Sequence, residues 1–255
     1  MRIRKTAVAG QFYPAHPEQL RTMVRGFLAE AKETGAIPKA IIAPHAGYRF
    51  SGPIAASAYA RLQGSSFQRV LLLGPAHTVR LQGIAASSAE IFESPLGNVL
   101  VDRTAVQASL TLPQVQIMDA AHVQEHGLEV HLPFLQMVCR DLVIVPLVIG
   151  TIETAKLTRL LATLYTPDSL IVISSDLSHY YDYATAQQLD KATSRAIEQL
   201  QPQSVQEACG RYPIRGVLQF AQQQGWQAET IDLRNSGDTG GSRERVVGYG
   251  AYVFT

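Results

Sequence analysis

Apolar residues recur with the spacing of a helix near the beginning of the chain. In residues 16–34 they run from Leu20 to Ala31 at intervals of three and four positions, which places them on one face of a helix. Pro17 falls in the expected first turn and Gly35 follows the segment, and these residue types commonly begin and end helices. The pattern predicts an amphipathic helix over residues 16–34.

Further along, short apolar runs alternate with segments of helical periodicity. The apolar runs are mostly continuous and rich in β-branched residues, which is typical of strands buried on both faces. They cover residues 40–43, 70–73, 142–149, 169–174, 229–233 and 246–254. The helical segments cover residues 53–62, 103–110, 124–140, 152–164, 184–200 and 214–224. This alternation predicts an α/β sandwich in which a central, mostly parallel sheet is flanked by helices.

Residues 93–102 carry turn residues next to a small apolar run, which predicts a peripheral strand or hairpin. No low-complexity stretch and no repeat of fixed period interrupts the sequence. We therefore expect a single layered domain over residues 1–255.

The charge balance narrows the range of partners. The 255 residues include 22 basic and 21 acidic side chains, for a formal net charge of +1, so neither a nucleic-acid-binding stripe nor a polybasic membrane patch is expected. Cys139 and Cys209 are too few for a disulfide framework. Neither a signal peptide nor a membrane span is expected from the apolar pattern. The composition indicates a reduced, cytoplasmic protein.

Side chains with ligand chemistry lie a few residues beyond the ends of several apolar runs. They are His45, His77, Asp176, His179 and Asp238. Because the carboxyl ends of parallel strands share one edge of a sheet, these side chains are expected to converge on one crevice. Imidazoles and carboxylates together bind iron, manganese, zinc or copper, and two histidines with one carboxylate form non-haem iron sites. A lone histidine in a turn is more often only hydrogen-bonded, but the recurrence predicts a metal site.

A second histidine cluster lies between residues 122 and 133, outside those runs. It contains His122, Glu125, His126, Glu129 and His131. Its spacing differs from the His-Glu-x-x-His pattern of zinc proteases. One interpretation is a capped helix start, with the carboxylates near the positive end of the helix dipole. The other is that a residue of this cluster faces the substrate or supports the metal site.

Nucleophilic chemistry receives less support. The pattern Gly-x-Ser-x-Gly of serine hydrolases is absent, and so are the glycine-rich nucleotide-binding patterns. Cys209, at an expected junction of helix and loop, is interpreted as a small packing residue rather than a nucleophile.

Taken together and in order, these residues resemble the Memo family, whose prokaryotic members are called AmmeMemoRadiSam system protein B. The matching strings are AGQFYP at 9–14, PHAGY at 44–48, GPAH at 74–77, EHGLEVHLP at 125–133, SSDLSH at 174–179 and CGRYP at 209–213. The resemblance spans nearly the whole chain. Memo proteins are similar in fold to class III extradiol ring-cleaving dioxygenases, which agrees with the α/β sandwich predicted above.

The resemblance implies roles for individual residues. His45 and His77 match the two histidine metal ligands, His179 matches the acid or base of the dioxygenases, and Asp176 matches an acidic residue of the same pocket. Tyr48, His126 and His131 are then candidates to contact the substrate.

The chain departs from the family pattern at the third metal ligand, because residues 235–239 contain no cysteine. An ungapped alignment with the family pattern places Thr239 at the position of the third ligand. A carboxylate oxygen, however, is a better ligand for a divalent ion than a hydroxyl. We therefore predict Asp238 as the ligand, although its segment is also an ordinary turn sequence in which Asp238 would cap backbone amides.

Two functions are compatible with these residues. The first is a metal-dependent redox enzyme, dioxygenase-like, holding iron, or else copper or zinc, and acting on a small organic substrate. The second is a non-catalytic adaptor that uses the same cleft to bind a peptide or metabolite. Metal-assisted hydrolysis is a weaker third option. A shared fold alone does not establish dioxygenase chemistry. The family name also implies partnership with AMMECR-like and radical SAM proteins.

Overall fold

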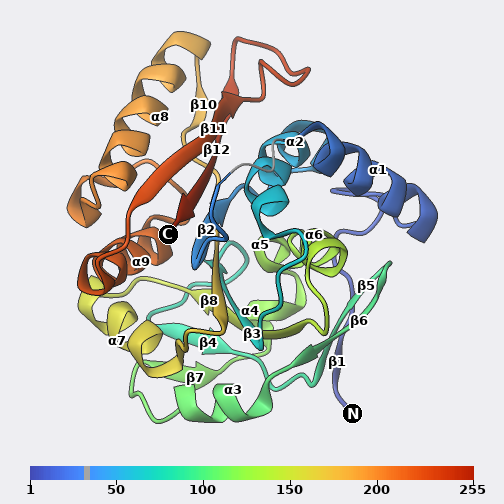
Figure 1. Ribbon diagram of the computed structural model, residues 1–255, viewed down its shortest axis with the longest axis vertical. Coiled ribbons are helices and arrows are strands. Elements are labelled where there is room, and N and C mark those ends of the chain that lie inside the picture. The colour runs from blue at the N-terminus through green and yellow to red at the C-terminus, as the bar shows by residue number, and fades with distance from the viewer. Residues whose placement is uncertain (32–34) are drawn as a thin grey trace.

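Five parallel strands form the centre of the structure, a computed structural model that describes residues 1–31 and 35–255 (Figure 1). In spatial order they are β6 (Gly97–Val101), β8 (Val143–Ile149), β3 (Arg69–Pro75), β9 (Ser169–Ser174) and β2 (Ala40–Ala43). The continuous apolar runs of β2, β3, β8 and β9 are buried almost throughout. This is what a sheet covered on both faces requires.

Further strands extend the sheet on both sides into a twelve-stranded, mixed assembly. Beside β2, the antiparallel strand β12 (Val246–Phe254) pairs also with β11 (Ala228–Asn235) and β10 (His179–Tyr181). Beyond β6 lie β5 (Ile91–Ser94) and β1 (Ile3–Arg4), and β4 (Ile84–Ala86) connects β8 to β7 (Val115–Ile117). The predicted α/β class with a central, mostly parallel sheet is confirmed.

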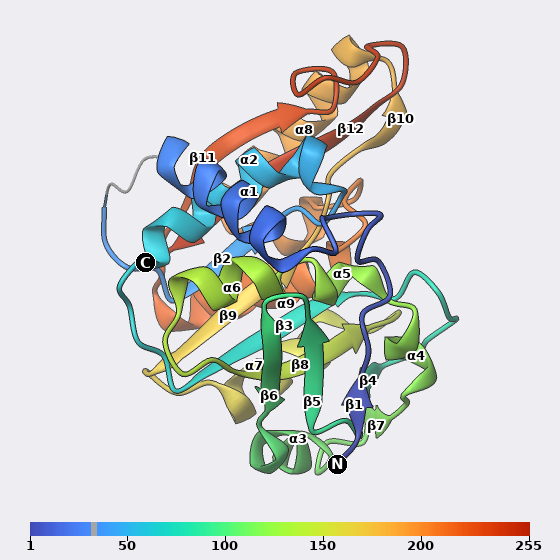
Figure 2. The same ribbon diagram turned by 90° about the vertical axis from the view of Figure 1, so that its right-hand side faces the viewer.

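The helices form groups around the sheet (Figure 2). α1 (Pro17–Glu30), α2 (Tyr48–Tyr59) and α6 (Leu132–Val138) pack against one another, and the 3-10 turn η1 (Ala60–Leu62) continues α2. α7 (Thr154–Leu164) packs between α9 (Arg211–Gln224) and α3 (Arg103–Ser109), while α8 (Tyr183–Glu198) covers β11 and β12. The short helices α4 (Ala120–Val123) and α5 (His126–Glu129) and the turn η2 (Pro202–Ser204) complete the chain.

Several predicted boundaries differ from the structure. The helix expected over 16–34 ends at Glu30, and residues 32–34 lie outside the described part of the chain. The helix expected over 124–140 is instead divided into α5 and α6, because Pro133 lacks the amide hydrogen that a continuous helix needs and is placed in the first turn of α6. The hairpin expected in 93–102 is formed by β5 and β6. Within residues 1–31 and 35–255, no helix combines the length and apolar character needed to cross a membrane.

A buried carboxylate ties the N-terminal segment to the rest of the fold. Glu129, at the end of α5, is completely buried and forms an ion pair with the buried guanidinium of Arg4. The backbone amides of Ala7 and Val8 donate to its two oxygens at 2.7 and 3.0 Å, and the hydroxyl of Tyr13 donates as well. A buried charge is tolerable only with this degree of hydrogen bonding. Glu129 therefore fixes the path of residues 4–13 over α5.

We predict that Glu129→Gln lowers the free energy of unfolding by about 3 kcal/mol, because it leaves the buried guanidinium of Arg4 without its counter-charge. Chemical denaturation measures the effect. The matched control is Glu93→Gln, which removes the partner of Lys5 in a largely exposed ion pair and should cost less than about 1 kcal/mol. Equal effects of the two substitutions would contradict the structural role of Glu129.

Candidate metal centre

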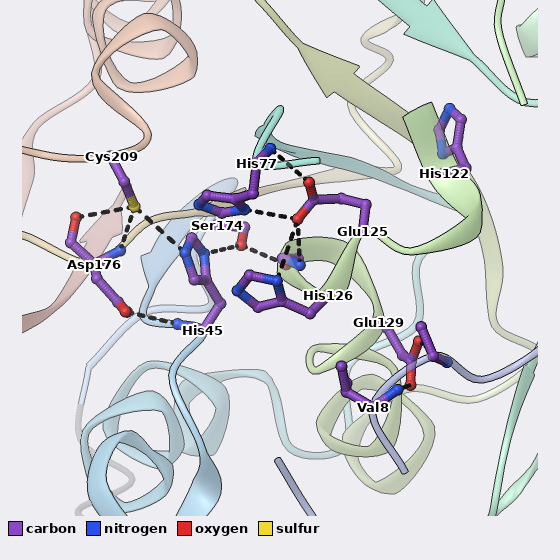
Figure 3. Close-up of polar contacts among 12 residues, drawn as sticks. Val8, His45, His77, His122, Glu125, His126, Glu129, Ser174, Asp176 and Cys209 are labelled. Carbon is purple, nitrogen blue, oxygen red and sulfur yellow. Dashed lines mark hydrogen bonds and ion pairs between the residues drawn. The ribbon is translucent and has the colours of Figure 1, made fainter. Parts of the chain in front are cut away.

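Three imidazoles meet at the carboxyl edge of the central strands. His45 follows β2, His77 follows β3, and His126 is the first residue of α5. Each offers a ring nitrogen, and the three nitrogens lie within 4.8 Å of one another. Figure 3 shows the rings of His45, His77 and His126 turned toward a common point. Nitrogens this close can bind one ion.

Hydrogen bonds fix the tautomer of His45. Its Nδ1 lies 2.6 Å from Oγ of Ser174, at the end of β9, and this hydroxyl donates its single proton to the carbonyl of Gly127. Ser174 can therefore only accept from His45, so the proton of the ring sits on Nδ1. The lone pair is then on Nε2, which the thiol of Cys209 approaches at 3.3 Å. This is the protonation state that a metal-binding histidine needs.

His77 is held in the same state by a carboxylate. The buried side chain of Glu125 accepts the backbone amide of His77 at 2.7 Å through Oε2 and approaches its Nδ1 at 2.7 Å through Oε1. An ionised carboxylate only accepts hydrogen bonds, so Nδ1 of His77 donates to it, and the lone pair of the neutral ring is then on Nε2. The same oxygen, Oε1, also accepts the amide of Gly127 and caps α5. Although burial raises the pKa of Glu125, the hydrogen bonds from His77 outweigh it and the pKa is lowered.

His126 completes the cluster by ring packing. Its ring stacks on that of His77 with centroids 4.6 Å apart, and Phe12 covers it at 4.8 Å. Burial lowers the pKa of both His126 and His45, and the neighbouring histidines lower it further. These two imidazoles are therefore neutral at neutral pH, which is the form that binds metal.

Gly127 allows these groups to approach one another. A methyl group on its Cα would lie 3.1 Å from Oε1 of Glu125 and 3.6 Å from Nδ1 of His45. The absence of a side chain at Gly127 therefore leaves space for Glu125 and His45.

Cys209 also lies at the cluster, in the turn before α9. Its Sγ is 3.3 Å from Nε2 of His45 and 3.3 Å from the amide nitrogen of Asp176 (Figure 3). Burial, followed by the charge of Asp176, raises the pKa of the thiol to about 12. Cys209 is more than the packing residue expected from sequence, because its thiol contacts a histidine of the cluster.

Asp176 and His179 lie beside the cluster but do not contact each other in the expected way. Oδ1 of Asp176 accepts the amide of His45 at 2.8 Å, and burial raises the pKa of this carboxyl to about 6. Nδ1 of His179 bonds instead to the carbonyl of Leu177 at 2.9 Å, so Leu177 rather than Asp176 orients the ring. The charge of His179 nevertheless acts on both His45 and Asp176.

Asp238 is not brought to this cluster. It is exposed in the turn after β11, where it accepts hydrogen bonds from the hydroxyl of Tyr183 at 2.6 Å and from the amide of Asn235 at 3.0 Å. Among the described residues, the grouping with His45 and His77 includes His126 instead. The group of side chains that could hold an ion therefore contains an imidazole where a carboxylate was expected. Asp238 instead accepts a backbone amide of its own turn, the other role that its sequence allowed.

Tyr48 and His131, expected near the substrate, lie in the interior. The hydroxyl of Tyr48 donates to the carbonyl of Val130, and Nδ1 of His131 lies 2.9 Å from the hydroxyl of Tyr59. Both side chains are almost fully buried. The hydroxyl of Tyr48 and Nδ1 of His131 thus form contacts between helices in the interior, away from the surface that a substrate could reach.

Fold and site together define an α/β protein with a candidate metal centre at the carboxyl edge of its parallel strands. The family described as "Memo-like protein" matches residues 4–253, and the chain belongs to this Memo family. The chain is 36% identical to a "MEMO1 family protein" of Aquifex aeolicus over the full length of both. It is 33% identical to one of Ignicoccus hospitalis, covering 100% of this chain and 99% of that protein. It is 34% identical to "Protein MEMO1" of Xenopus laevis, covering 84% of this chain and 82% of that protein.

The raised pKa of Asp176 predicts a pH dependence of stability. The carboxyl keeps its proton up to about pH 6 in the folded protein but only to its ordinary value of 3.8 in the unfolded chain. Its ionisation therefore removes stability as pH rises from about 4 to 6, by about 2–3 kcal/mol at roughly 1.4 kcal/mol for each unit of pKa difference. Asp176→Asn cannot ionise and retains an oxygen to accept the His45 amide.

Urea denaturation of metal-free wild type and Asp176→Asn at pH 4 and pH 7 measures this difference. We expect the variant to gain about 2–3 kcal/mol relative to wild type between the two pH values. A difference between the two proteins that is the same at both pH values would show that Asp176 does not titrate in this way.

Proposed function

We propose that this protein is a metal-dependent redox enzyme that acts on a small organic substrate. It holds a divalent transition metal, with iron as the first candidate, at His45, His77 and His126. The observation that carries the proposal is the pair of fixed tautomers. Hydrogen bonds to Ser174 and Glu125 occupy Nδ1 of His45 and His77, so that Nε2 of each ring is the nitrogen available to an ion beside His126. Three imidazoles suit iron, copper and zinc.

The support behind the ligands favours a metal site over a chance cluster. Histidine ligands of metals commonly donate their other ring hydrogen to a carboxylate or another acceptor, which orients the ring and makes it a better ligand. His77 has such a carboxylate in Glu125, and His45 has such an acceptor in Ser174. Glu125 also caps α5, so the same buried carboxylate positions the helix that carries His126.

A bound iron or copper ion would supply electron transfer between the substrate and an oxidant such as dioxygen. The chain's own residues would handle protons and water. Because Nδ1 of His179 is bonded to the carbonyl of Leu177, its Nε2 is free to accept a proton from a substrate, as a general base does. His45 is almost fully buried, which limits the access of water to its side of the site.

Cys209 bears on the identity of the metal. A thiol 3.3 Å from Nε2 of His45 is placed to join the ligand set, and a bound metal deprotonates a coordinating thiol despite its raised pKa. Thiolate ligands favour copper and zinc as well as iron. Loading experiments therefore need to compare these three metals.

We predict that protein loaded anaerobically with iron(II) and freed of excess ion retains stoichiometric metal by elemental analysis. His45→Ala, His77→Ala and His126→Ala should each lower retention at least about tenfold, because each removes one of three donors. Asp238→Asn is the matched control and should retain the wild-type amount. Loss of metal in Asp238→Asn together with retention in His126→Ala would refute this ligand set.

The redox part of the proposal is tested with substrate-dependent oxygen uptake by the loaded protein across a panel of small organic compounds. Iron- or copper-loaded protein should consume oxygen, zinc-loaded protein should not because zinc has no redox chemistry, and His179→Ala should reduce uptake without loss of metal. Uptake that is equal in the zinc-loaded protein, or absent from all forms, would count against a redox enzyme.

A further inference from the structure

A cavity of about 490 Å³ opens beside the candidate metal centre. Its walls are the loop after β3, the carboxyl end of β8 and the beginning of α9. Cys209 is part of its wall, and the same thiol contacts Nε2 of His45. A molecule in this cavity would therefore lie next to the histidine cluster, at the strand edge where α/β proteins bind ligands.

The cavity carries uncompensated positive charge. Arg80 and Arg211 line it, and none of its other lining residues is acidic. In residues 1–31 and 35–255, neither arginine has an ion pair with a carboxylate. Two guanidinium groups facing one cavity without a counter-charge form an attractive site for an anion.

A second cavity of the same protein provides a contrast. It has a volume of about 420 Å³, lies between α1, α2 and β11, and also contains two arginines. There Arg61 lies 3.8 Å from a carboxylate oxygen of Glu229, and Arg234 binds Asp232 at 2.5 Å. The arginines of this second cavity are thus neutralised by carboxylates. Of the two cavities, only the one beside the metal centre has arginines and no carboxylate in its lining.

The guanidinium of Arg211 is held in place by its neighbour. It lies over the ring of Tyr212 at 4.9 Å from the centroid. The side chains of Thr151 and Arg211 beside the hydroxyl of Tyr212 lower the pKa of this group. An arginine positioned in advance loses less conformational freedom when it binds a ligand. Val79 and Leu81 add apolar surface to the lining of the same cavity.

We propose that Arg80 and Arg211 bind the oxyanion of the substrate, a carboxylate or phosphate group on a small organic molecule, and thereby hold its body against the metal centre. This inference rests on the proposed function for its catalytic meaning. The binding of the anion itself depends on the cavity and not on the metal. Guanidinium groups match the geometry of carboxylates and phosphates through paired hydrogen bonds.

Isothermal titration of the full-length protein with three probes tests the inference. Benzoate and phenyl phosphate carry the two oxyanions on the same apolar ring, and benzamide is the neutral counterpart of benzoate. Each probe is titrated into chelator-treated, metal-free protein and into metal-loaded protein. We expect at least one oxyanion probe to bind roughly tenfold more tightly than benzamide in both forms, because charge-assisted hydrogen bonds exceed neutral ones by about this factor. The tighter of the two anions then identifies the class of substrate.

Arg80→Gln and Arg211→Gln should each weaken binding of that anion roughly tenfold and leave metal retention unchanged, whereas Arg211→Lys should lose less because it keeps the charge. Arg25→Gln, which removes an exposed charge from α1, is the matched control and should bind as wild type does. Failure of both oxyanions to bind more tightly than benzamide would overturn the inference. So would anion binding that needs the metal and is indifferent to both arginines.

These outcomes are separable from failure of the proposed function. If the protein retains no metal but anion binding still depends on Arg80 and Arg211, the metal enzyme is refuted and the anion site stands. If metal is retained and the arginine variants bind anions normally, the metal centre stands and the anion site is refuted.

Discussion

The buried carboxylate of Glu125 is the interaction on which the candidate site depends. It accepts the backbone amide and Nδ1 of His77, and it caps α5, the helix that begins with His126. A four-residue helix has no stability of its own in water. The position of His126 relative to His77 is therefore set by hydrogen bonds to Glu125 and by stacking of the two rings. Loss of the carboxylate would release two of the three imidazoles at once.

The fold accommodates the buried charges of Glu125 and Glu129 by placing each carboxylate beside backbone amides that need an acceptor. The two residues lie at the two ends of α5, and each accepts hydrogen bonds from two backbone amides. Glu129 holds the N-terminal segment with Arg4, and that segment supplies Phe12, which covers His126. The two carboxylates thus connect the beginning of the chain to the edge of the parallel sheet and close one side of the cluster.

Much of the sheet could be predicted because burial on both faces leaves a clear signal. The runs at 40–43, 169–174 and 246–254 coincide with β2, β9 and β12. β1, β4, β7 and β10 were missed because two or three residues are too few to show a period. The boundaries inside 124–140 were wrong because the α5 and α6 segments are held by tertiary contacts that local periodicity does not report.

In the site, too, the residues that follow buried strands could be predicted, and those placed by tertiary contacts could not. His45 and His77 were found because they directly follow buried parallel strands, whose carboxyl ends must meet. His126 was seen, but its role as a member of the cluster needed the position of α5, which residue spacing does not give. Asp238 was chosen for its oxygen chemistry, yet its carboxylate is occupied by its own turn. Cys209 and Glu125 belong to the motifs CGRYP and EHGLEVHLP, which match the family. These motifs were the only indication in the sequence that the two residues contribute to the site.

The most direct test of this account is the metal affinity of Glu125→Gln, measured by competition with a chelator of known affinity, with folding checked by circular dichroism. Carboxylates that orient a ligating histidine typically account for about 10–100-fold in metal affinity. The account predicts a folded variant whose affinity falls by at least about tenfold. A folded Glu125→Gln protein with wild-type metal affinity would contradict the claim that this carboxylate organises the site.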